Sequence, residues 1–184
     1  MTIHNIKIEK WVEPELIAQL FSKKYGDKGL SWLDSDGSEN GEWSFLGVNP
    51  KMVISSRNNK DLRDVDNPFN KLKKIKNGFW IGWLSYEAGA WLEQKNQWQK
   101  SEITTLWIAS YDPIIKINLL NKEIFIEGSD LKDIYVYKNL IQTINKSPLQ
   151  NNQTLEFDFS NINLNEISKV FQKNIIKIKE LISI

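Results

Sequence analysis

The side chains that most often carry out chemistry in enzymes are scarce in this sequence. Its 184 residues contain one histidine, His4, and no cysteine. A terminal segment is expected to fray, so His4 is a poor candidate for a Ser-His-Asp triad or a metal site. The missing cysteines exclude disulfides, zinc fingers, iron–sulfur clusters and thiol catalysis. We therefore expect neither a catalytic residue nor a metal ligand within this chain.

Two groups of charged side chains have suitable chemistry but a simpler explanation. Glu87 and Glu93 could act as an acid and a base, yet they lie six residues apart beside aromatic residues and are expected to be surface charges. A basic cluster could bind phosphate, and it consists of Lys71, Lys73, Lys74 and Lys76. Its interleaved Leu72 and Ile75 indicate the solvated side of an ordinary helix. The common phosphate-binding, metalloprotease and hydrolase motifs are absent.

The overall charge and hydropathy limit the class of partner. The chain has 24 Lys and Arg residues against 23 Asp and Glu residues, so no strong field draws it to nucleic acid or to an anionic membrane. No apolar run approaches the length of a membrane span, and the first residues lack a signal-type apolar core. We expect a cytoplasmic protein whose partner is a small molecule or another protein.

The hydrophobic patterns predict an α+β fold, with antiparallel strands in a two-sheet core and helices on the outside. Helices are expected at 13–26, with Pro14 in the first turn and Gly26 as the stop, at about 131–144, and in the basic segment KLKKIK after a loop at 57–68. Strands are expected in GEWSFLGVNP and KMVISS, joined around Asn49 and Pro50, after a short extended opening. The alternating segment IIKINLLNKEIFIEG predicts a hairpin that turns at Asn121 and Lys122.

The segment Gly78 to Glu93, GFWIGWLSYEAGAWLE, is unusually rich in glycine and aromatic residues. On a strand, Phe79, Ile81 and Trp83 point to one face while Trp80, Gly82 and Leu84 point to the other. Because both faces are apolar, we expect a central strand. Glycine between two tryptophans indicates that a backbone or a bulky ring packs against it.

The domain organisation is expected to be a sheet-rich region at 1–146, a polar linker at 147–162 and a last helix at 163–184. Six apolar residues of that helix form one stripe: Ile167, Val170, Phe171, Ile175, Ile178 and Ile182. The stripe has no polar tail after it, which indicates a chain truncated at the start of a further region. The alternative is a C-terminal helix that covers a sheet.

Several blocks of the sequence resemble a known enzyme family. GFWIGWLSYEAGAWLE is similar to the "GG-aliphatic-x-GY-x-SYD" segment in the N-terminal half of chorismate-utilising enzymes, namely aminodeoxychorismate synthase component I and anthranilate synthase component I. SWLDSDGSENGEWSFLGVNP resembles the family's "FLDS…GRYSFLGADP" block, and LWIASYDPIIKINLLNKEIFIEG resembles its "YDxxIxxD…xIxIxG" hairpin. The last helix is similar to the family's helix that leads into the catalytic half. The resemblance spans nearly the whole chain, in the family's order.

The resemblance implies a function for the whole protein and none for this chain alone. It implies amination of chorismate to aminodeoxychorismate for 4-aminobenzoate and folate synthesis, with ammonia from a glutamine amidotransferase subunit. It places the chorismate site and the glutamates that engage Mg²⁺ in the C-terminal half, which is absent here. Asp34 in WLDS and the segment SYEAGAWLE favour this branch over anthranilate synthase, which serves tryptophan synthesis. The alternative from another class is a stand-alone regulatory module that binds an aromatic amino acid.

One ligand site of the family maps onto this half. Its "L-[DE]-S" segment and "YSF-[LI]" strand line a pocket that holds tryptophan as an inhibitor or as a structural ligand. The resemblance transfers that pocket to Leu33, Asp34, Ser35, Trp43, Ser44, Phe45 and Leu46. The chemistry fits, since apolar side chains can hold an indole while hydroxyl and backbone groups bind the polar end of an amino acid. The sequence departs from the family at Glu42 and Trp43, where Arg and Tyr are common.

Overall fold

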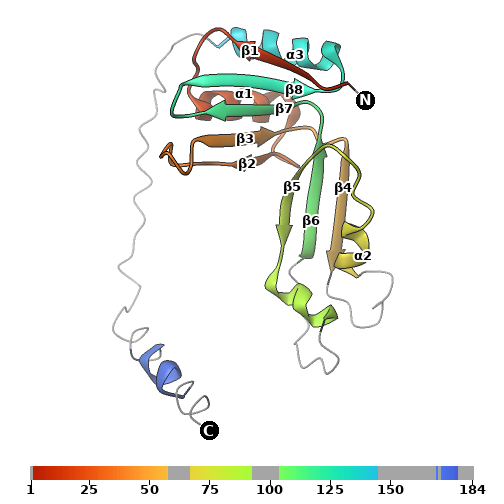
Figure 1. Cartoon of the computed structure of the whole chain (residues 1–184), viewed down its shortest axis with the longest axis vertical. Helices are drawn as coiled ribbons and strands as arrows, with labels where there is room; N and C mark the ends of the chain where they lie inside the picture. Colours follow the sequence, from red (N-terminus) through yellow and green to blue (C-terminus); the bar gives the residue numbers. More distant parts are fainter. Residues whose placement is uncertain (1, 58–66, 93–103, 145–168, 170, 178–184) are drawn as a thin grey trace. The chain divides into compact units, whose positions relative to one another are not determined.

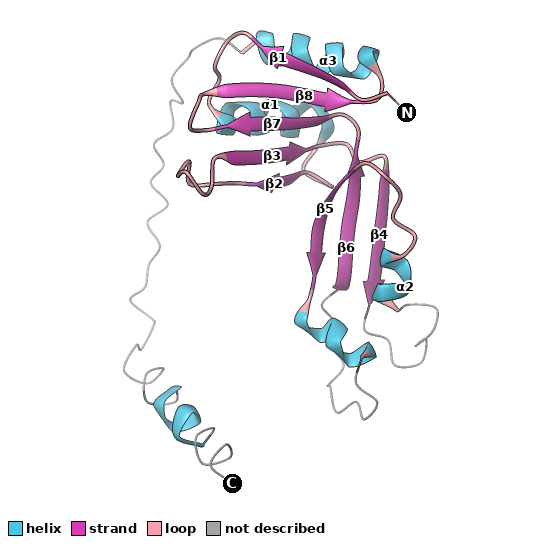
Figure 2. Cartoon of the chain, in the orientation of Figure 1, coloured by secondary structure: helices cyan, strands magenta, loops and turns pink. Residues whose placement is uncertain are grey.

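The computed structural model describes residues 2–57, 67–92, 104–144, 169 and 171–177. The chain divides into two compact units, Met1–Ser147 and Pro148–Ile184. In the second unit, residues 171–177 are helical (Figures 1 and 2). The expected linker and four stripe residues, Ile167, Val170, Ile178 and Ile182, lie outside the described residues. The first unit has the expected α+β fold, with two antiparallel sheets and a few helices.

A five-stranded antiparallel sheet forms the larger layer of the first unit (Figure 2). Its strand order is β1 (His4–Ile8), β8 (Glu123–Gly128), β7 (Ile114–Asn118), β3 (Trp43–Gly47) and β2 (Ser31–Leu33). Helices α1 (Pro14–Tyr25) and α3 (Leu131–Gln142) cover one face of it (Figure 1). Ile115, Ile117, Ile124 and Ile126 lie on that face and are almost fully buried. The core of the unit therefore lies between this sheet and the two helices.

Local signals account for the boundaries of these elements. Pro14 occupies the first turn of α1, and the backbone N–H of Gly26, at φ 82°, bonds to the Ser22 carbonyl and ends it. The Asp130 side chain accepts the backbone N–H of Lys132 at 2.8 Å and caps α3. The turn of the β7–β8 hairpin places Lys122 at φ 54°. The predicted helices at 13–26 and 131–144 and the predicted hairpin are confirmed.

A three-stranded antiparallel sheet has the order β4 (Met52–Arg57), β6 (Thr104–Tyr111) and β5 (Phe79–Leu84). It carries a short helix, α2 (Pro68–Leu72), and a 3₁₀ turn, η2 (Tyr86–Trp91). The strands predicted around Asn49 and Pro50 are confirmed as β3 and β4. They do not pair with each other, because each belongs to a different sheet.

Three sequence expectations are wrong. The aromatic strand β5 is an edge strand of its sheet and not a central one, since among the described strands it pairs only with β6. Helix α2 ends at Leu72, so most of the basic segment KLKKIK follows the helix. His4 does not fray within a loose terminus, because it lies in β1 opposite Gly128. In each case a non-local pairing or a short capped turn outweighs the local pattern.

Contacts around the end of β6 join the two sheets. Tyr111 is buried beneath Gly47 of β3, and its hydroxyl donates to the Gly29 carbonyl at 2.7 Å. Because that hydroxyl has a single proton, Ser31 Oγ donates to it in turn, at 2.6 Å. Ile114 of β7 and Phe45 of β3 pack with Ile81 and Ala109 of the other sheet. The second face of the five-stranded sheet thus meets the three-stranded sheet.

Candidate functional site

The residues transferred from the tryptophan pocket lie on β2, β3 and the loop that connects them. The two strands are antiparallel neighbours at one side of the five-stranded sheet, with Leu33 opposite Phe45 and Trp32 opposite Leu46. Asp34 and Ser35 follow β2 directly, and Trp43 begins β3. The fold therefore brings all seven residues into one local region.

The alternation of β3 divides these residues between the two faces of the sheet. Leu46 is almost fully buried in the core beneath α1 and α3, and Ser44, two residues earlier on the same face, is fully buried. Trp43 and Phe45 lie on the opposite face, as does the half-exposed Leu33. A ligand on this second face would therefore meet Leu33, Trp43 and Phe45, while Leu46 belongs to the core.

Two hydrogen bonds shape the loop between β2 and β3. The buried Ser44 hydroxyl donates to Asp34 Oδ1 at 3.0 Å, and the Ser35 hydroxyl donates to the carbonyl of Gly41. The loop closes further through the Gly37 N–H and the Gly41 carbonyl, 3.0 Å apart. The bond from Ser44 holds the carboxylate of the exposed Asp34 beside β3, and the other two bonds close the loop.

The second face of the sheet combines aromatic rings with one partly buried ion pair. Lys116 Nζ lies 5.6 Å from the centre of the Trp43 ring and 6.0 Å from that of Phe79. It is also 3.1 Å from a carboxylate oxygen of Glu127. Trp43 and Phe125 approach with ring centres 5.9 Å apart. A cation among aromatic rings, paired with a carboxylate, offers both polar signs beside an apolar surface.

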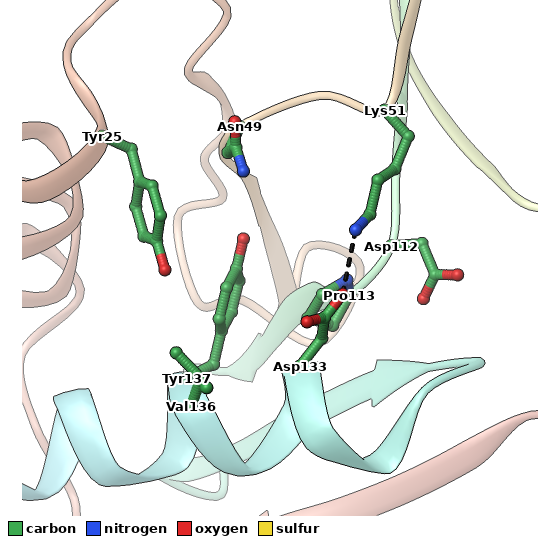
Figure 3. A pocket seen from close by; sticks show the side chains of 8 residues that line it. All are labelled: Tyr25, Asn49, Lys51, Asp112, Pro113, Asp133, Val136 and Tyr137. Atoms are coloured by element: carbon green, nitrogen blue, oxygen red, sulfur yellow. Dashed lines mark hydrogen bonds and ion pairs between the residues drawn. The ribbon is translucent and has the colours of Figure 1, made fainter.

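A small polar cavity of about 70 Å³ lies elsewhere in the first unit (Figure 3). The residues around it come from α1, the turn after β3, the segment between β6 and β7, and α3: Tyr25, Asn49, Lys51, Asp112, Pro113, Asp133, Val136 and Tyr137. Lys51 Nζ lies 2.9 Å from Asp133 Oδ2, and the rings of Tyr25 and Tyr137 stand together across the cavity (Figure 3). Its volume suits one or two water molecules better than an organic ligand.

The electrostatics of this cavity follow from its contacts. The hydrogen bond to Asp133 raises the pKa of Lys51, against the opposing effect of partial burial. Burial raises the pKa of Tyr137 far above its ordinary value, and the negative charges of Asp133 and Asp112 act in the same direction. Asp112 itself accepts the backbone N–H of Ser129 at 2.7 Å and the Ser129 hydroxyl. Four polar side chains at this cavity therefore have partners within the fold: Lys51, Asp133, Asp112 and Tyr137, whose hydroxyl donates to the Val48 carbonyl at 3.3 Å.

Sequence reasoning did not find this cavity, because its residues come from four segments far apart in the chain. Only the positive φ of Asn49, at 50°, has a local signal, the Asn-Pro pair at 49 and 50. Within the described ranges, no group of three or more His, Cys, Asp or Glu side chains could hold a metal ion. No helix in the part of the chain that the structure describes is long and apolar enough to cross a membrane.

Comparisons of the sequence with models of known protein families and with curated proteins find no match.

Proposed function

We propose that this chain is the N-terminal, non-catalytic portion of a chorismate-aminating synthase, aminodeoxychorismate synthase component I. The observation that carries the proposal is the placement of the three blocks that resemble the family. They lie on β2 and β3, on β5, and on β6 to β8. In the fold these strands are neighbours, since β2 pairs with β3, β3 with β7, β5 with β6, and β7 with β8. Blocks separated in sequence thus form one connected pair of sheets.

The chemistry of the proposed enzyme belongs to the rest of the protein. Chorismate carries two carboxylates, and its amination needs a metal to orient it together with an acid or a base. Among the described residues, no three His, Cys, Asp or Glu side chains lie together where they could hold Mg²⁺. His4 lies in the edge strand β1. We assign Mg²⁺ and chorismate to the C-terminal half, and the supply of ammonia to a glutamine amidotransferase subunit.

The role left to this portion is to provide a scaffold and a contact surface. Phe45, Phe79 and Trp107 are only partly buried against the smaller core cluster, and Trp83 and Leu33 are each about half exposed. Apolar side chains gathered on a sheet face mark an interaction surface when they are not covered. We propose that the catalytic half packs against this surface, to which β2 and β3 of the larger sheet and β5 and β6 of the smaller sheet contribute.

The same face gives the tryptophan pocket a physical basis. Leu33, Trp43 and Phe45 would contact the indole ring. Lys116 and Glu127, paired at 3.1 Å beside Trp43, would bind the polar end of the ligand. The Asp34 carboxylate is instead bonded to Ser44 of the opposite face, and Ser35 follows it in the loop. This arrangement also supports the second candidate, a stand-alone module that binds an aromatic amino acid, because it requires no catalytic residue.

Genetic complementation with the complete gene tests the proposal. The complete gene should continue beyond codon 184 into a segment that resembles GDIFQ, and its product should restore growth of a bacterium that needs 4-aminobenzoate. Rescue of a tryptophan-requiring strain instead would move the protein to the anthranilate branch. A stop codon directly after Ile184, with rescue of neither strain, would favour the stand-alone module. A gene truncated at codon 146 serves as the control and should rescue neither strain.

A further inference from the structure

Among the sheet edges of the described residues, the edge of β5 that does not face β6 is unusual. An exposed strand edge offers unpaired backbone groups, and proteins protect such edges with short strands, charges, bulges or covering segments. Strand β2 has three residues, and β1 carries Lys7. Strand β4 has an irregular register between Ser56 and Arg57, and Lys71 of α2 donates to its Ser55 carbonyl at 2.6 Å. By contrast, β5 reads FWIGWL, and within the described part of the chain it has none of these features.

The backbone groups that face this open edge follow from the ladder with β6. The Ser85 N–H donates to the Thr105 carbonyl at 2.9 Å, and the register continues as Trp83 opposite Trp107 and Ile81 opposite Ala109. Hydrogen-bonded pairs alternate along an antiparallel ladder, so the odd-numbered residues of β5 bond to β6. The N–H and C=O groups of Trp80, Gly82 and Leu84 therefore point outward. Gly82 and Leu84 are exposed, as expected for an open edge.

We propose that this edge pairs with the same edge of a second copy of the chain, so that two three-stranded sheets join into one of six strands. A two-fold axis at Gly82 makes Trp80 of one copy face Leu84 of the other and sets Gly82 opposite Gly82. This register uses all three outward donors and all three outward acceptors of each copy. It is an isologous contact, which closes at two copies.

The side chains of β5 suit this pairing on both faces of the joined sheet. On one face, Trp80 of each copy meets Leu84 of the other. On the opposite face, Trp83 of one copy, whose ring already stacks on Trp107 with centres 5.0 Å apart, meets Ile81 of the other. Aromatic and aliphatic cross-strand pairs stabilise sheets, and the strand has no charge that would repel its copy. Trp83 and Leu84 are 49% and 46% exposed in the single chain, so pairing buries apolar surface.

A second copy fits this edge better than a charged partner does, because the strand offers neither salt bridges nor charged hydrogen bonds to select one. The inference concerns the edge of the smaller sheet and does not depend on the proposed enzymatic function. It also differs from packing of the sheet face against a catalytic half, because edge pairing requires the outward groups of β5.

Sedimentation velocity of the 184-residue chain over a range of concentrations tests the inference. We expect a monomer–dimer equilibrium with a Kd on the order of micromolar, as is usual for a small interface. Leu84→Lys should weaken the dimer at least about tenfold, because it places a charge in each of two symmetric contacts. Leu120→Lys is the matched control, since Leu120 is similarly exposed but lies in the β7–β8 turn. A chain that stays monomeric, or equal effects of the two lysines, would overturn the inference.

Two further experiments test the pairing of the edge more closely. Leu84→Pro removes an outward N–H while leaving the bonds to β6 in place, so it should weaken the dimer without changing the circular dichroism of the chain. Because the protein has no cysteine, the register can be trapped by mixing Ile81→Cys and Trp83→Cys chains under oxidising conditions. The proposed register puts these positions opposite each other at a Cα distance of about 4.5 Å, within disulfide range. Rapid cross-linking in the mixture, but not in either variant alone, is the expected result, and its absence counts against the register.

Discussion

Gly47 should be intolerant of even a single added methyl group, because it lies over the ring that joins the two sheets. A Cβ built on Gly47 would lie 2.5–2.7 Å from three ring carbons of Tyr111, far inside van der Waals contact. The ring has no room to retreat, since Tyr111 is 1% exposed. Its hydroxyl is also held at 2.6 Å by Ser31 Oγ and at 2.7 Å by the Gly29 carbonyl.

The free-energy cost of Gly47→Ala can be estimated from these contacts. Overpacking of a buried site costs about 1–3 kcal/mol. Displacing the ring also strains two hydrogen bonds, each worth about 0.5–1.5 kcal/mol. Alanine returns about 0.5–1 kcal/mol through the lower entropy of the unfolded chain. We expect the free energy of unfolding to fall by about 2–3 kcal/mol.

Urea denaturation of the single variants Gly47→Ala and Tyr111→Phe and of the double variant measures both the cost and its cause. Once Tyr111→Phe has removed the hydroxyl, the ring can tilt away from the new methyl group. Gly47→Ala should then cost about 1 kcal/mol less than in the parent chain. Glu39→Ala, in the exposed loop after β2, is the control and should change the free energy by less than about 0.5 kcal/mol. Additive effects, or a Gly47→Ala variant as stable as this control, would refute the reasoning.

Three further predictions concern other parts of the first unit. Burial raises the pKa of Tyr137 in the folded state above its ordinary value of 10.0, so the contribution of Tyr137 to stability is complete below pH 10 and is lost as the pH rises beyond that value. When the pH is raised from 9 to 11, the free energy of unfolding should fall by about 1.4 kcal/mol less in Tyr137→Phe than in the parent chain. An equal fall in both proteins would argue against the burial of this hydroxyl. Asp130→Ala removes the cap of α3 and should lower the unfolding free energy by about 1 kcal/mol. Asp133→Asn breaks only an exposed ion pair with Lys51 and should lower it by less. If thermal unfolding showed the larger loss for Asp133→Asn, the assigned roles would be wrong. In the product of the complete gene, Ser35→Trp should fill the pocket and weaken tryptophan binding in isothermal titration, and an unchanged affinity would remove Ser35 from the site.

Local patterns predict the elements of this fold well when one segment contains the whole signal. The hairpin at 114–128 has alternating isoleucines on both sides of a polar turn, and the helix at 13–26 has a proline at its start and a glycine at its end. The close approach of a neighbouring backbone to Gly82 is also predicted correctly from its position between two tryptophans. In the structure a Cβ there would meet the Trp107 carbonyl and would lie 2.6 Å from the Cα of Ile108.

Features that depend on distant pairing could not be predicted in the same way. The sequence of β5 is apolar on both faces, yet among the described strands it lies at an edge, because a strand's place in a sheet depends on which distant segments pair with it. Strand alternation places Ser44 and Phe45 on opposite faces of the sheet. The sequence of β3 does not show which of these faces α1 and α3 cover. The resemblance identifies a stretch of residues, whereas the fold determines which of them can reach a ligand.

Product formation from purified chorismate is the most direct test of the central claim. The complete gene product, supplied with Mg²⁺ and ammonia, should form aminodeoxychorismate, while residues 1–184 alone should form none above background under the same conditions. Turnover by the 184-residue chain alone would contradict the assignment of the chemistry to the remainder of the protein. A complete gene product that folds but converts no chorismate would contradict the proposed function itself.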